Sequence, residues 1–258
     1  MRDLGIRDRV AIVTGASSGI GRATAVAFAR EGAKVALLAR DEARLHDTAR
    51  DVKRAGGEAL VLPTDVTVPE QCERAVRATV DRWGGIDILV NAAGIIASGT
   101  IEDTSLEQWD RMFNINVRAV FYLMRLCAPY LIERKGAVVN VSSVTGLRAF
   151  PNVLAYCASK AAVDHLTRCA ALELAPKGVR VNAVNPGVVV TELHRRGGMD
   201  ERAYQAFLER SKSTHPLGRV GRPGEVADLI LFLASPHAGW ITGDTISIDG
   251  GRAQTCLR

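Results

Sequence analysis

Residues 9–21 read RVAIVTGASSGIG, a short apolar run that leads directly into a loop with three glycines. The run 9–13 predicts a buried strand, and a helix is expected at residues 21–31. Glycines at this junction let the backbone turn tightly and leave bare N–H groups at the start of the helix, where a pyrophosphate fits. The spacing is GxxxGxG rather than the common GxGxxG. The stretch predicts a dinucleotide-binding loop, with an ordinary glycine-rich turn as the alternative.

Outward from this loop, short β-rich runs alternate with longer helical stretches along the whole chain. Further strands are expected at residues 34–39, 58–62, 86–91, 137–141, 179–184 and 245–248. Further helices are expected at residues 42–55, 69–83 (with Thr67 as the N-cap), 105–134, 152–175 and 223–234.

The predicted strands are continuous Val, Ile and Leu runs without polar alternation. Such strands are buried on both faces, which is typical of a parallel sheet covered by helices. Repeated right-handed βαβ units give an α/β fold, a doubly wound parallel sheet of the Rossmann type with helices on both faces. No linker or repeat interrupts the pattern, so residues 1–258 are expected to form a single domain.

The chain has 258 residues, of which 47% are hydrophobic and 24% charged, as in an ordinary globular protein. Its clean apolar runs are far shorter than the roughly 20 residues of a membrane helix. The first ten residues carry charges where a signal peptide has its apolar stretch. We therefore expect a cytoplasmic protein with no membrane partner.

The charged and metal-binding residue types are scattered. The net charge is +5, but Lys and Arg are interleaved with acids, so nucleic acid is not an expected partner. The five histidines show no paired spacing, and the cysteines are odd in number without a CxxC pair, so we expect reduced thiols and no metal site. The cysteines are Cys72, Cys127, Cys157, Cys169 and Cys256.

Four further motifs follow the glycine loop: Asn91-Ala92-Ala93-Gly94, Ser143, Tyr156 with Lys160, and Pro186-Gly187. Together, in this order and at these spacings, they resemble the short-chain dehydrogenase/reductase family over essentially the whole chain. The overall pattern is similar to members that reduce 3-oxoacyl groups on acyl-carrier protein. The resemblance implies hydride transfer between a nicotinamide cofactor and a ketone or secondary alcohol.

Tyr156 and Lys160 are four residues apart in a helical pattern and therefore lie on one helix face. The pKa of a free tyrosine, near 10, is too high for efficient acid–base work at neutral pH, and an adjacent ammonium is expected to lower it. The resemblance implies that Tyr156 is the proton donor, that Lys160 binds the ribose and that Ser143 positions the substrate.

A fourth catalytic residue, Asn116, is similar to the family asparagine that anchors a water in the proton relay. Asn114 competes with it for this role, and Ser142 competes with Ser143. Cys157 has no base beside it and is interpreted as core filler.

Cofactor-binding residues are expected at four places beyond the catalytic set. Asp65 resembles the residue that accepts a hydrogen bond from the adenine amino group, and Val66 would flank the ring. The remaining expected contacts are Gly15, Ser17, Ser18, Gly19, Ile20 and Gly21 in the loop, Asn91, Ala92 and Gly94 near the ribose, and Pro186, Gly187, Val189 and Thr191 at the nicotinamide.

The end of the second strand favours NADP over NAD. Enzymes that use NAD need an acceptor there for the ribose 2′-hydroxyl, whereas a 2′-phosphate needs a cation. The acid position is taken by Ala39, and Arg40 stands where relatives that use NADP carry a basic residue. Asp41 comes one residue too late and is expected to cap the next helix. Ser17 is a minor helper.

The substrate pocket is expected to form from Ile95, Ile96, the loop 145–153 and a charged, flexible lid at residues 192–215. Two substrate classes stay open: an acyl group on an acidic carrier protein, and a small ketone, steroid or sugar alcohol. Arg134, Lys135 and Lys177 could attract such a carrier protein, but solvated surface charge is the favoured interpretation of these cations. An NAD-dependent alcohol dehydrogenase and a silent NADP-binding sensor are the alternatives. The apolar helices 105–134 and 152–175 lead us to expect a homotetramer.

Overall fold

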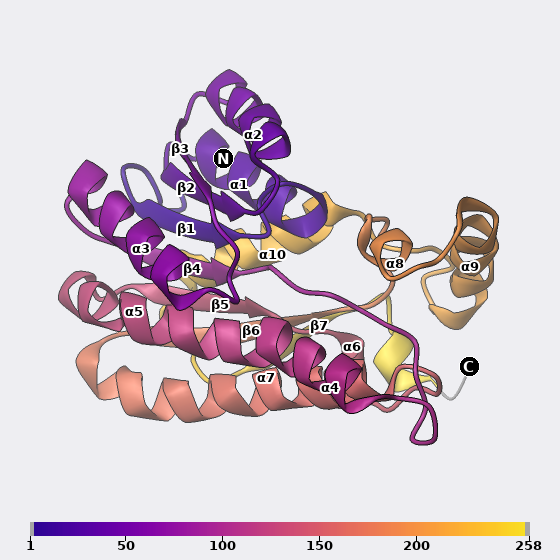
Figure 1. The fold of residues 1–258 in the computed structure, drawn as a ribbon. Helices are drawn as coiled ribbons and strands as arrows, with labels where there is room; N and C mark the ends of the chain where they lie inside the picture. The colour runs from indigo at the N-terminus through magenta and orange to yellow at the C-terminus, as the bar shows by residue number, and fades with distance from the viewer. Residues whose placement is uncertain (1–2, 256–258) are drawn as a thin grey trace.

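The computed structural model describes residues 3–255, and its centre is one parallel sheet of seven strands. The strand order is β3-β2-β1-β4-β5-β6-β7, so the chain runs outward from β1 in one direction and then returns to build the other half (Figure 1). This doubly wound order confirms the fold predicted from the sequence.

The strands lie close to their expected positions. Their bounds are β1 Val10–Thr14, β2 Lys34–Ala39, β3 Glu58–Pro63, β4 Ile88–Asn91, β5 Ala137–Val141, β6 Arg180–Pro186 and β7 Thr245–Ile248. Every neighbouring pair is parallel. The inner strands are buried on both faces, as expected for a parallel sheet between two helix layers.

Helices cover both faces of the sheet. The first layer contains α1 (Gly19–Arg30), α2 (Glu42–Arg54) and α10 (Pro223–Ala234), which share one apolar core. The second contains α3 (Pro69–Trp83), α5 (Ala119–Arg134) and α7 (Leu154–Leu174), which share another. In Figure 1, α1 and α2 lie near the top of the view and α5 and α7 near the bottom, while α10 and α3 lie beside the middle strands.

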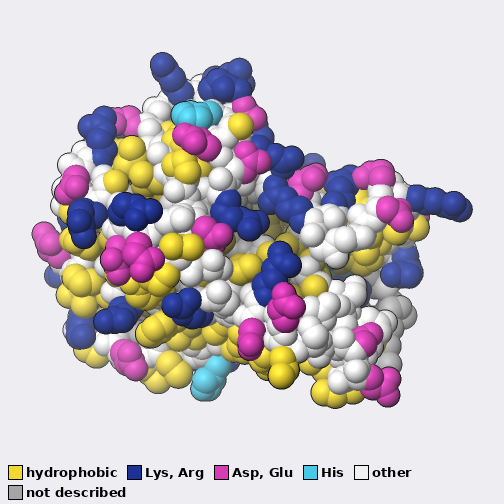
Figure 2. Space-filling view, in the orientation of Figure 1, with side chains coloured by type: hydrophobic (Ala, Val, Ile, Leu, Met, Phe, Trp, Pro, Cys, Tyr) yellow, Lys and Arg dark blue, Asp and Glu magenta, His cyan; other side chains and the backbone are white. Residues whose placement is uncertain are grey.

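Three further helices lie at one edge of the sheet. These are α6 (Val144–Leu147), α8 (Leu193–Arg196) and α9 (Glu201–Thr214), and the last two form the lobe that projects beyond the body of the protein in Figures 1 and 2. The lobe contains most of the segment predicted to be a lid.

Two helix starts differ from the sequence prediction. The predicted N-cap Thr67 donates both its backbone N–H and its hydroxyl to the Asp65 carboxylate, at 2.9 and 2.7 Å. It is used in that turn, so Val68 becomes the N-cap of α3 and Pro69 takes the first helical position. The predicted helix 152–175 begins only at Leu154, because Asn152 has a positive φ of 64°.

The expected helix 105–134 is three consecutive pieces: α4 (Leu106–Phe113), a π turn (Asn114–Arg118) and α5. By length and composition alone, the stretch 106–134 would suffice to cross a membrane. About 39% of its most apolar window is buried inside the protein, where α5 packs on the sheet. A helix of a protein core passes the same test, so the finding is weak evidence for a membrane span.

On the face shown in Figure 2, basic and acidic side chains are interspersed. Cys72, Cys127, Cys157 and Cys169 are free thiols, and Cys256 lies outside the described residues. Between residues 3 and 255, no three His, Cys, Asp or Glu side chains are arranged to hold a metal ion.

Candidate active site

The predicted site residues come from distant parts of the sequence, and the parallel sheet brings them to one edge. The glycine loop follows β1, Asn91 ends β4, Ser143 follows β5 and Pro186 ends β6. Because all seven strands run the same way, these carboxyl ends meet, and ligands of open α/β sheets bind outside such ends where the strand order reverses. Here the order reverses between β1 and β4.

The glycine loop needs its glycines for close backbone contact. Gly15 has a positive φ of 64°, and a Cβ there would lie 2.8 Å from the carbonyl oxygen of Ala92. A Cβ on Gly21 would collide with the carbonyl of Gly15. The hydroxyl of Thr14 fixes the neighbouring strand end, because it accepts hydrogen bonds of 2.9 Å from the N–H groups of both Ala92 and Ala93.

The start of α1 suits an anion. Its N-cap, Ser18, makes no side-chain cap, and the first turn contains no acidic residue. The first N–H groups of the helix are therefore not taken up by a capping side chain, and the helix dipole favours negative charge there. Ser17 is buried in the loop, and Ile20 packs into the first core. This geometry fits the pyrophosphate of a dinucleotide.

Tyr156 is buried in the first turn of α7, next to Ser143. Burial raises the pKa of the phenol to about 12, and hydrogen bonding by Ser143 acts weakly in the opposite direction. The prediction that the Lys160 ammonium lowers the pKa of Tyr156 is therefore wrong for the protein without its cofactor. The Nζ of Lys160 lies 5.7 Å from the centre of the Tyr156 ring and donates its hydrogen bond to the Val141 carbonyl.

Lys160 lies one turn further along α7 and is also buried. Its Nζ donates to the backbone oxygen of Val141 at 2.8 Å. Burial lowers the pKa of the ammonium to about 8, while the carboxylate of Asp164 acts in the opposite direction. A Cβ on Gly94 would lie 3.7 Å from this Nζ, so the loop after β4 runs alongside the lysine.

The Ser143 hydroxyl has a free proton to donate. Its oxygen accepts a hydrogen bond of 3.1 Å from the N–H of Thr145 and so caps α6. Asn185 of β6 holds the same residue from below, because its amide donates to the Ser143 carbonyl at 2.9 Å. The competing Ser142 instead donates to the carbonyl of Lys160 at 3.2 Å, which supports the helix from beneath.

Asn116 is buried in the π turn. Its side chain clasps the backbone of Ile95: the oxygen accepts from the Ile95 N–H at 2.9 Å, and the nitrogen donates to the Ile95 carbonyl at 3.0 Å. The same nitrogen donates to Ser159 at 3.0 Å. Asn114, the competing residue, accepts instead from Arg118 on the exposed side of the helix.

The residues that were predicted to determine whether the cofactor is NADP or NAD lie at the end of β2. Arg40 is exposed, and within residues 3–255 its side chain makes no hydrogen bond or ion pair. Asp41 caps α2 by accepting from the N–H of Arg44 at 3.0 Å, as predicted. Asp65 lies near Arg40, and the pKa of its carboxyl is lowered, with hydrogen bonds from Thr67 and the nearby Arg40 charge outweighing the opposite effect of burial.

The segment 187–191 after β6 is held by backbone hydrogen bonds on most of its length. The N–H of Gly187 donates to Ile248, that of Val190 to Gly221 and that of Thr191 to the Tyr204 hydroxyl. The N–H of Val188 donates to a histidine ring. Among the described residues this leaves the N–H of Val189 without a partner, as a cofactor carboxamide would require.

The residues expected near the ribose and adenine also line this edge. The Asn91 amide donates to Asn140 at 2.9 Å, while its oxygen is buried without a hydrogen-bond partner in the described chain. Ala92 is half-buried behind the glycine loop, and Val66 is half-buried in the second core.

On the substrate side, an apolar cluster surrounds Tyr156. It contains Met112, Ala155, Tyr156 and, partly buried, Ile95, Ile96, Ala97, Trp109 and Val153. The lid reaches this wall, since a Cβ on Gly197 would lie 2.8 Å from the carbonyl of Ile96. All three predicted sources of the pocket, the β4 loop, the loop 145–153 through Val153 and the lid, therefore contribute to the wall beside Tyr156.

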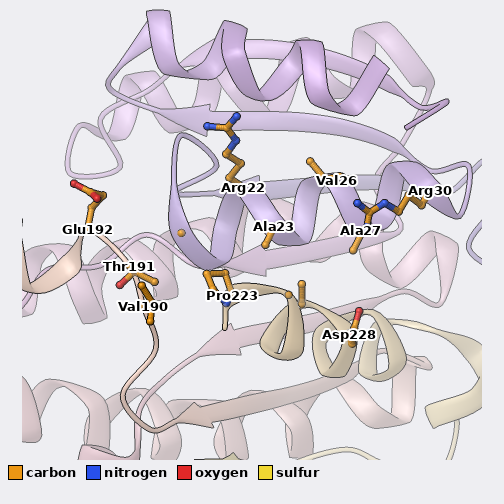
Figure 3. Close-up of a pocket in the computed structure, with 13 residues that line it drawn as sticks. Arg22, Ala23, Val26, Ala27, Arg30, Val190, Thr191, Glu192, Pro223 and Asp228 are labelled. Atoms are coloured by element: carbon orange, nitrogen blue, oxygen red, sulfur yellow. The ribbon is translucent and has the colours of Figure 1, made fainter. Parts of the chain in front are cut away.

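A pocket of about 440 Å³ lies outside this centre (Figure 3). It is bounded by α1, by the start of α10 and by residues 190–192, and none of the catalytic candidates lines it. Gly19 and Thr191 form its inner wall, where a Cβ on Gly19 would lie 3.2 Å from the Thr191 methyl group. The pocket is thus a neighbour of the glycine loop and not the place of the chemistry.

The cations suggested to attract a carrier protein lie at the wrong edge. Arg134 and Lys135 precede β5, Lys177 precedes β6, and Arg134 donates to the carbonyl of Gly84 ahead of β4. The amino ends of parallel strands lie opposite the carboxyl ends, where Tyr156 is. This position agrees with the favoured interpretation of these residues as solvated surface charge and speaks against a role in bringing a carrier protein to the site.

Several supporting residues were not predicted. Tyr204 of the lid is fully buried and clasps the backbone of Thr191, and Asp164 pairs with Asn185 beneath Ser143. A sequence signal existed for Asn185, because it is a polar residue in a strand that is buried over most of its length. Tyr204 lies in a polar segment whose pattern carries no such signal.

Comparison with known proteins identifies the family. The sequence model of the enoyl-(acyl carrier protein) reductase family matches residues 15–253. The chain is 39% identical to the 3-oxoacyl-[acyl-carrier-protein] reductase FabG of Thermotoga maritima, over 95% of this chain and 98% of that protein. The chain belongs to the short-chain dehydrogenase/reductase family.

Relatives within the short-chain dehydrogenases/reductases differ in what their names say they act on. The chain is 39% identical to a cyclopentanol dehydrogenase of Comamonas testosteroni, over 95% of this chain and 97% of that protein. The crystal structure of L-sorbose reductase from Gluconobacter frateurii, complexed with NADPH and L-sorbose, is similar with a TM-score of 0.92 and 33% identity, over 98% of this chain and 100% of that one. The chain is thus an oxidoreductase of this family, which acts on alcohols or ketones with a nicotinamide cofactor.

Proposed function

We propose that this short-chain dehydrogenase/reductase transfers hydride from NADPH to a ketone, or back from the secondary alcohol, with Tyr156 as the general acid or base. One observation carries the proposal: a buried phenol stands beside a serine hydroxyl and a buried ammonium, in an apolar wall next to the glycine loop. A tyrosine and lysine at this spacing on an ordinary surface helix would be exposed.

In the proposed reduction, Tyr156 donates its proton to the substrate oxygen. The pKa of about 12 keeps the phenol protonated at neutral pH, which is the form that an acid needs. Ser143 donates a second hydrogen bond to the same oxygen, since its own oxygen already accepts from Thr145. The cofactor, when bound, supplies the hydride and, once oxidised, a positive charge at the nicotinamide.

Lys160 has two proposed tasks. Its ammonium stabilises the phenolate that remains after proton transfer, because a cation near the ring favours the charged form. Nζ bonds in the structure to only one acceptor, Val141, and an ammonium has three donors. The remaining donors can bind the ribose hydroxyls.

Asn116 is proposed to shape the site through the backbone of Ile95. Both ends of its amide are used in that clasp, so the proposed water of a proton relay would be held by the distorted backbone of the π turn. Such turns occur often at functional sites.

The cofactor is proposed to be NADP because of Arg40. An exposed guanidinium with no partner in the described chain is available for a phosphate, and Ala39 supplies no acceptor for a 2′-hydroxyl. L-sorbose reductase, whose structure was solved with NADPH, shows that a close fold accommodates this cofactor. The residues proposed to hold it are Gly15, Ser17, Ser18, Gly19, Ile20, Gly21, Arg40, Asp65, Val66, Asn91, Ala92, Gly94, Tyr156, Lys160, Pro186, Gly187, Val189 and Thr191.

The substrate is proposed to be a small, uncharged ketone. The wall around Tyr156 is apolar, and the relatives named for cyclopentanol and L-sorbose act on small molecules. We further propose one cofactor-binding domain with a lid at residues 192–215, and a homotetramer in the cytoplasm. Exposed apolar side chains on α5 and α7, among them Phe121 and Leu172, support pairing of these helices between subunits.

The test is a panel of small ketones with NADPH and with NADH, for the wild type and Tyr156→Phe. We expect turnover by the wild type, and unchanged NADPH binding with almost no turnover by the variant, which lacks only the phenol oxygen. Activity of Tyr156→Phe within about tenfold of the wild type would exclude Tyr156 as the acid. Tight NADPH binding without turnover of any ketone would instead favour a silent sensor, and a preference for NADH an NAD-dependent alcohol dehydrogenase.

A further inference from the structure

His215 is a buried histidine that the proposed chemistry does not use. It follows the last residue of α9, and only 3% of its surface is exposed. The ring is enclosed between two glycines: a Cβ on Gly187 would lie 2.8 Å from its Nε2, and one on Gly250 would lie 3.5 Å from its Cβ. His215 therefore connects the end of the lid, the end of β6 and the turn after β7.

Both ring nitrogens of His215 have backbone partners, and these partners fix the protonation state. Nδ1 lies 2.6 Å from the carbonyl oxygen of Ser211, which can only accept. Nε2 lies 3.1 Å from the N–H of Val188, which can only donate. Nδ1 must therefore carry the proton and Nε2 must be bare, so the network selects one neutral tautomer.

The bond to Val188 orients the segment next to it. Val189 forms a parallel bridge with Gly221, in which Gly221 bonds the carbonyl of Val188 and the N–H of Val190. In such a bridge the N–H of the central residue points away from its partner, so the N–H of Val189 faces away from Gly221 and stays unpaired within residues 3–255. We infer that neutral His215 is a positioning residue, which holds Val188 so that the backbone of Val189 can bind the nicotinamide carboxamide. This inference rests on the proposed function.

The same bond makes cofactor binding sensitive to acid. A protonated ring would turn an N–H toward the N–H of Val188, and the bond would be lost. Two charged groups act on the ring: Arg252 disfavours the proton, and Asp249 favours it. Asp249 is already engaged, because its carboxylate accepts from the N–H groups of Gly251 and Ala253. Burial lowers the pKa of His215 further, so the ring is neutral at pH 7 and gains its proton only in acid.

The experiment measures NADP⁺ affinity by calorimetry at about pH 7.5 and about pH 5, for the wild type, His215→Gln and His215→Phe. A glutamine offers an amide oxygen to Val188 and does not titrate in this range, whereas phenylalanine offers nothing. We expect the Kd of the wild type to rise about threefold to tenfold more in acid than that of His215→Gln, as for loss of one hydrogen bond. His215→Phe should be weakened at both pH values.

The cofactor's own phosphate also gains a proton near pH 6. Because the wild type and the variants are compared at the same pH, this effect is equal for all of them and cancels. His237→Gln is the matched control, because His237 is exposed and lies at the far end of α10. Its ring bonds only the carbonyl of Asp3 among the described residues. It should behave as the wild type. Circular dichroism at both pH values verifies that each protein is folded.

Parallel acid weakening of the wild type and His215→Gln would overturn the inference, as would unchanged affinity of His215→Phe. Neither result touches the proposed function. No binding of NADP⁺ or NAD⁺ by the wild type at pH 7.5 would overturn the proposed function itself, and the inference with it.

Discussion

Replacement of Arg40 by alanine should weaken NADPH and leave NADH almost unchanged. The guanidinium is exposed and free of partners within the described residues, so the variant breaks no internal contact and should fold normally. A charge-assisted hydrogen bond contributes about 1.5–3 kcal/mol. Solvent screening at an exposed position favours the lower half of this range, which corresponds to about a tenfold to fortyfold loss.

The assay is kcat/KM for both cofactors with one ketone, for the wild type, Arg40→Ala and Ala39→Asp. The aspartate supplies an acceptor for the 2′-hydroxyl and repels a phosphate, so it should improve NADH while it harms NADPH. Arg50→Ala is the charge-matched control, since Arg50 is an exposed residue of α2 that pairs with Asp47. A wild type that already prefers NADH, or an unchanged NADPH value in Arg40→Ala, would refute the assignment of NADP.

Four further outcomes follow from the structure. Because burial raises the pKa of Tyr156 to about 12, alcohol oxidation, which needs the phenolate, should become steadily faster as the pH rises above neutrality, while ketone reduction should not. Reduction that becomes faster at high pH, or oxidation that becomes slower, would contradict this. Arg180→Met should lower the free energy of unfolding by about 2–3 kcal/mol in urea titrations, because the guanidinium binds the carbonyls of Leu233, Ala234 and Ser235 at the end of α10; Arg82→Met, which loses only an exposed ion pair, should change it little. In thiol labelling of the native protein, Cys169 should react at once and the buried Cys72 and Cys127 not at all, since burial raises the pKa of both thiols; mass spectrometry identifies the sites. Light scattering should report a tetramer, and a particle of 27.7 kDa at micromolar concentration would dispose of it.

The sheet could be predicted because the strand residues are mostly apolar, with few polar residues such as Asn140 and Asn185 among them. A strand such as β4 has one physical environment compatible with its side chains, the interior of a parallel sheet, and the glycines between β1 and α1 allow only a tight turn. The candidate catalytic pair could be proposed from the sequence because Tyr156 and Lys160 lie on one face of a single helix, so their proximity is a local property.

Long-range contacts could not be predicted. Whether Lys160 contacts the phenol or the Val141 carbonyl depends on how β5 packs against α7, and no pattern in either segment records this. The positions of Arg134, Lys135 and Lys177 could not be predicted for a related reason, since charge composition does not state at which edge of the sheet a residue lies. The clasp between Asn116 and Ile95 joins a helix to a loop 21 residues earlier.

The π turn at residues 114–118 has a consequence for how such a site can be gained or lost. In a π turn the hydrogen bonds join residues i and i+5, so the turn contains more residues than one turn of an α-helix. In an α-helix each residue advances about 100° around the axis. Deletion of a single residue here would let α4 and α5 fuse into one regular helix, with α4 rotated by about 100° relative to α5. Asn116 would leave Ile95 while the core behind α5 stayed intact. A one-codon deletion would thus disrupt the proposed site and leave the rest of the fold intact. A change of this size would suffice to convert an enzyme into a binding protein of the same fold.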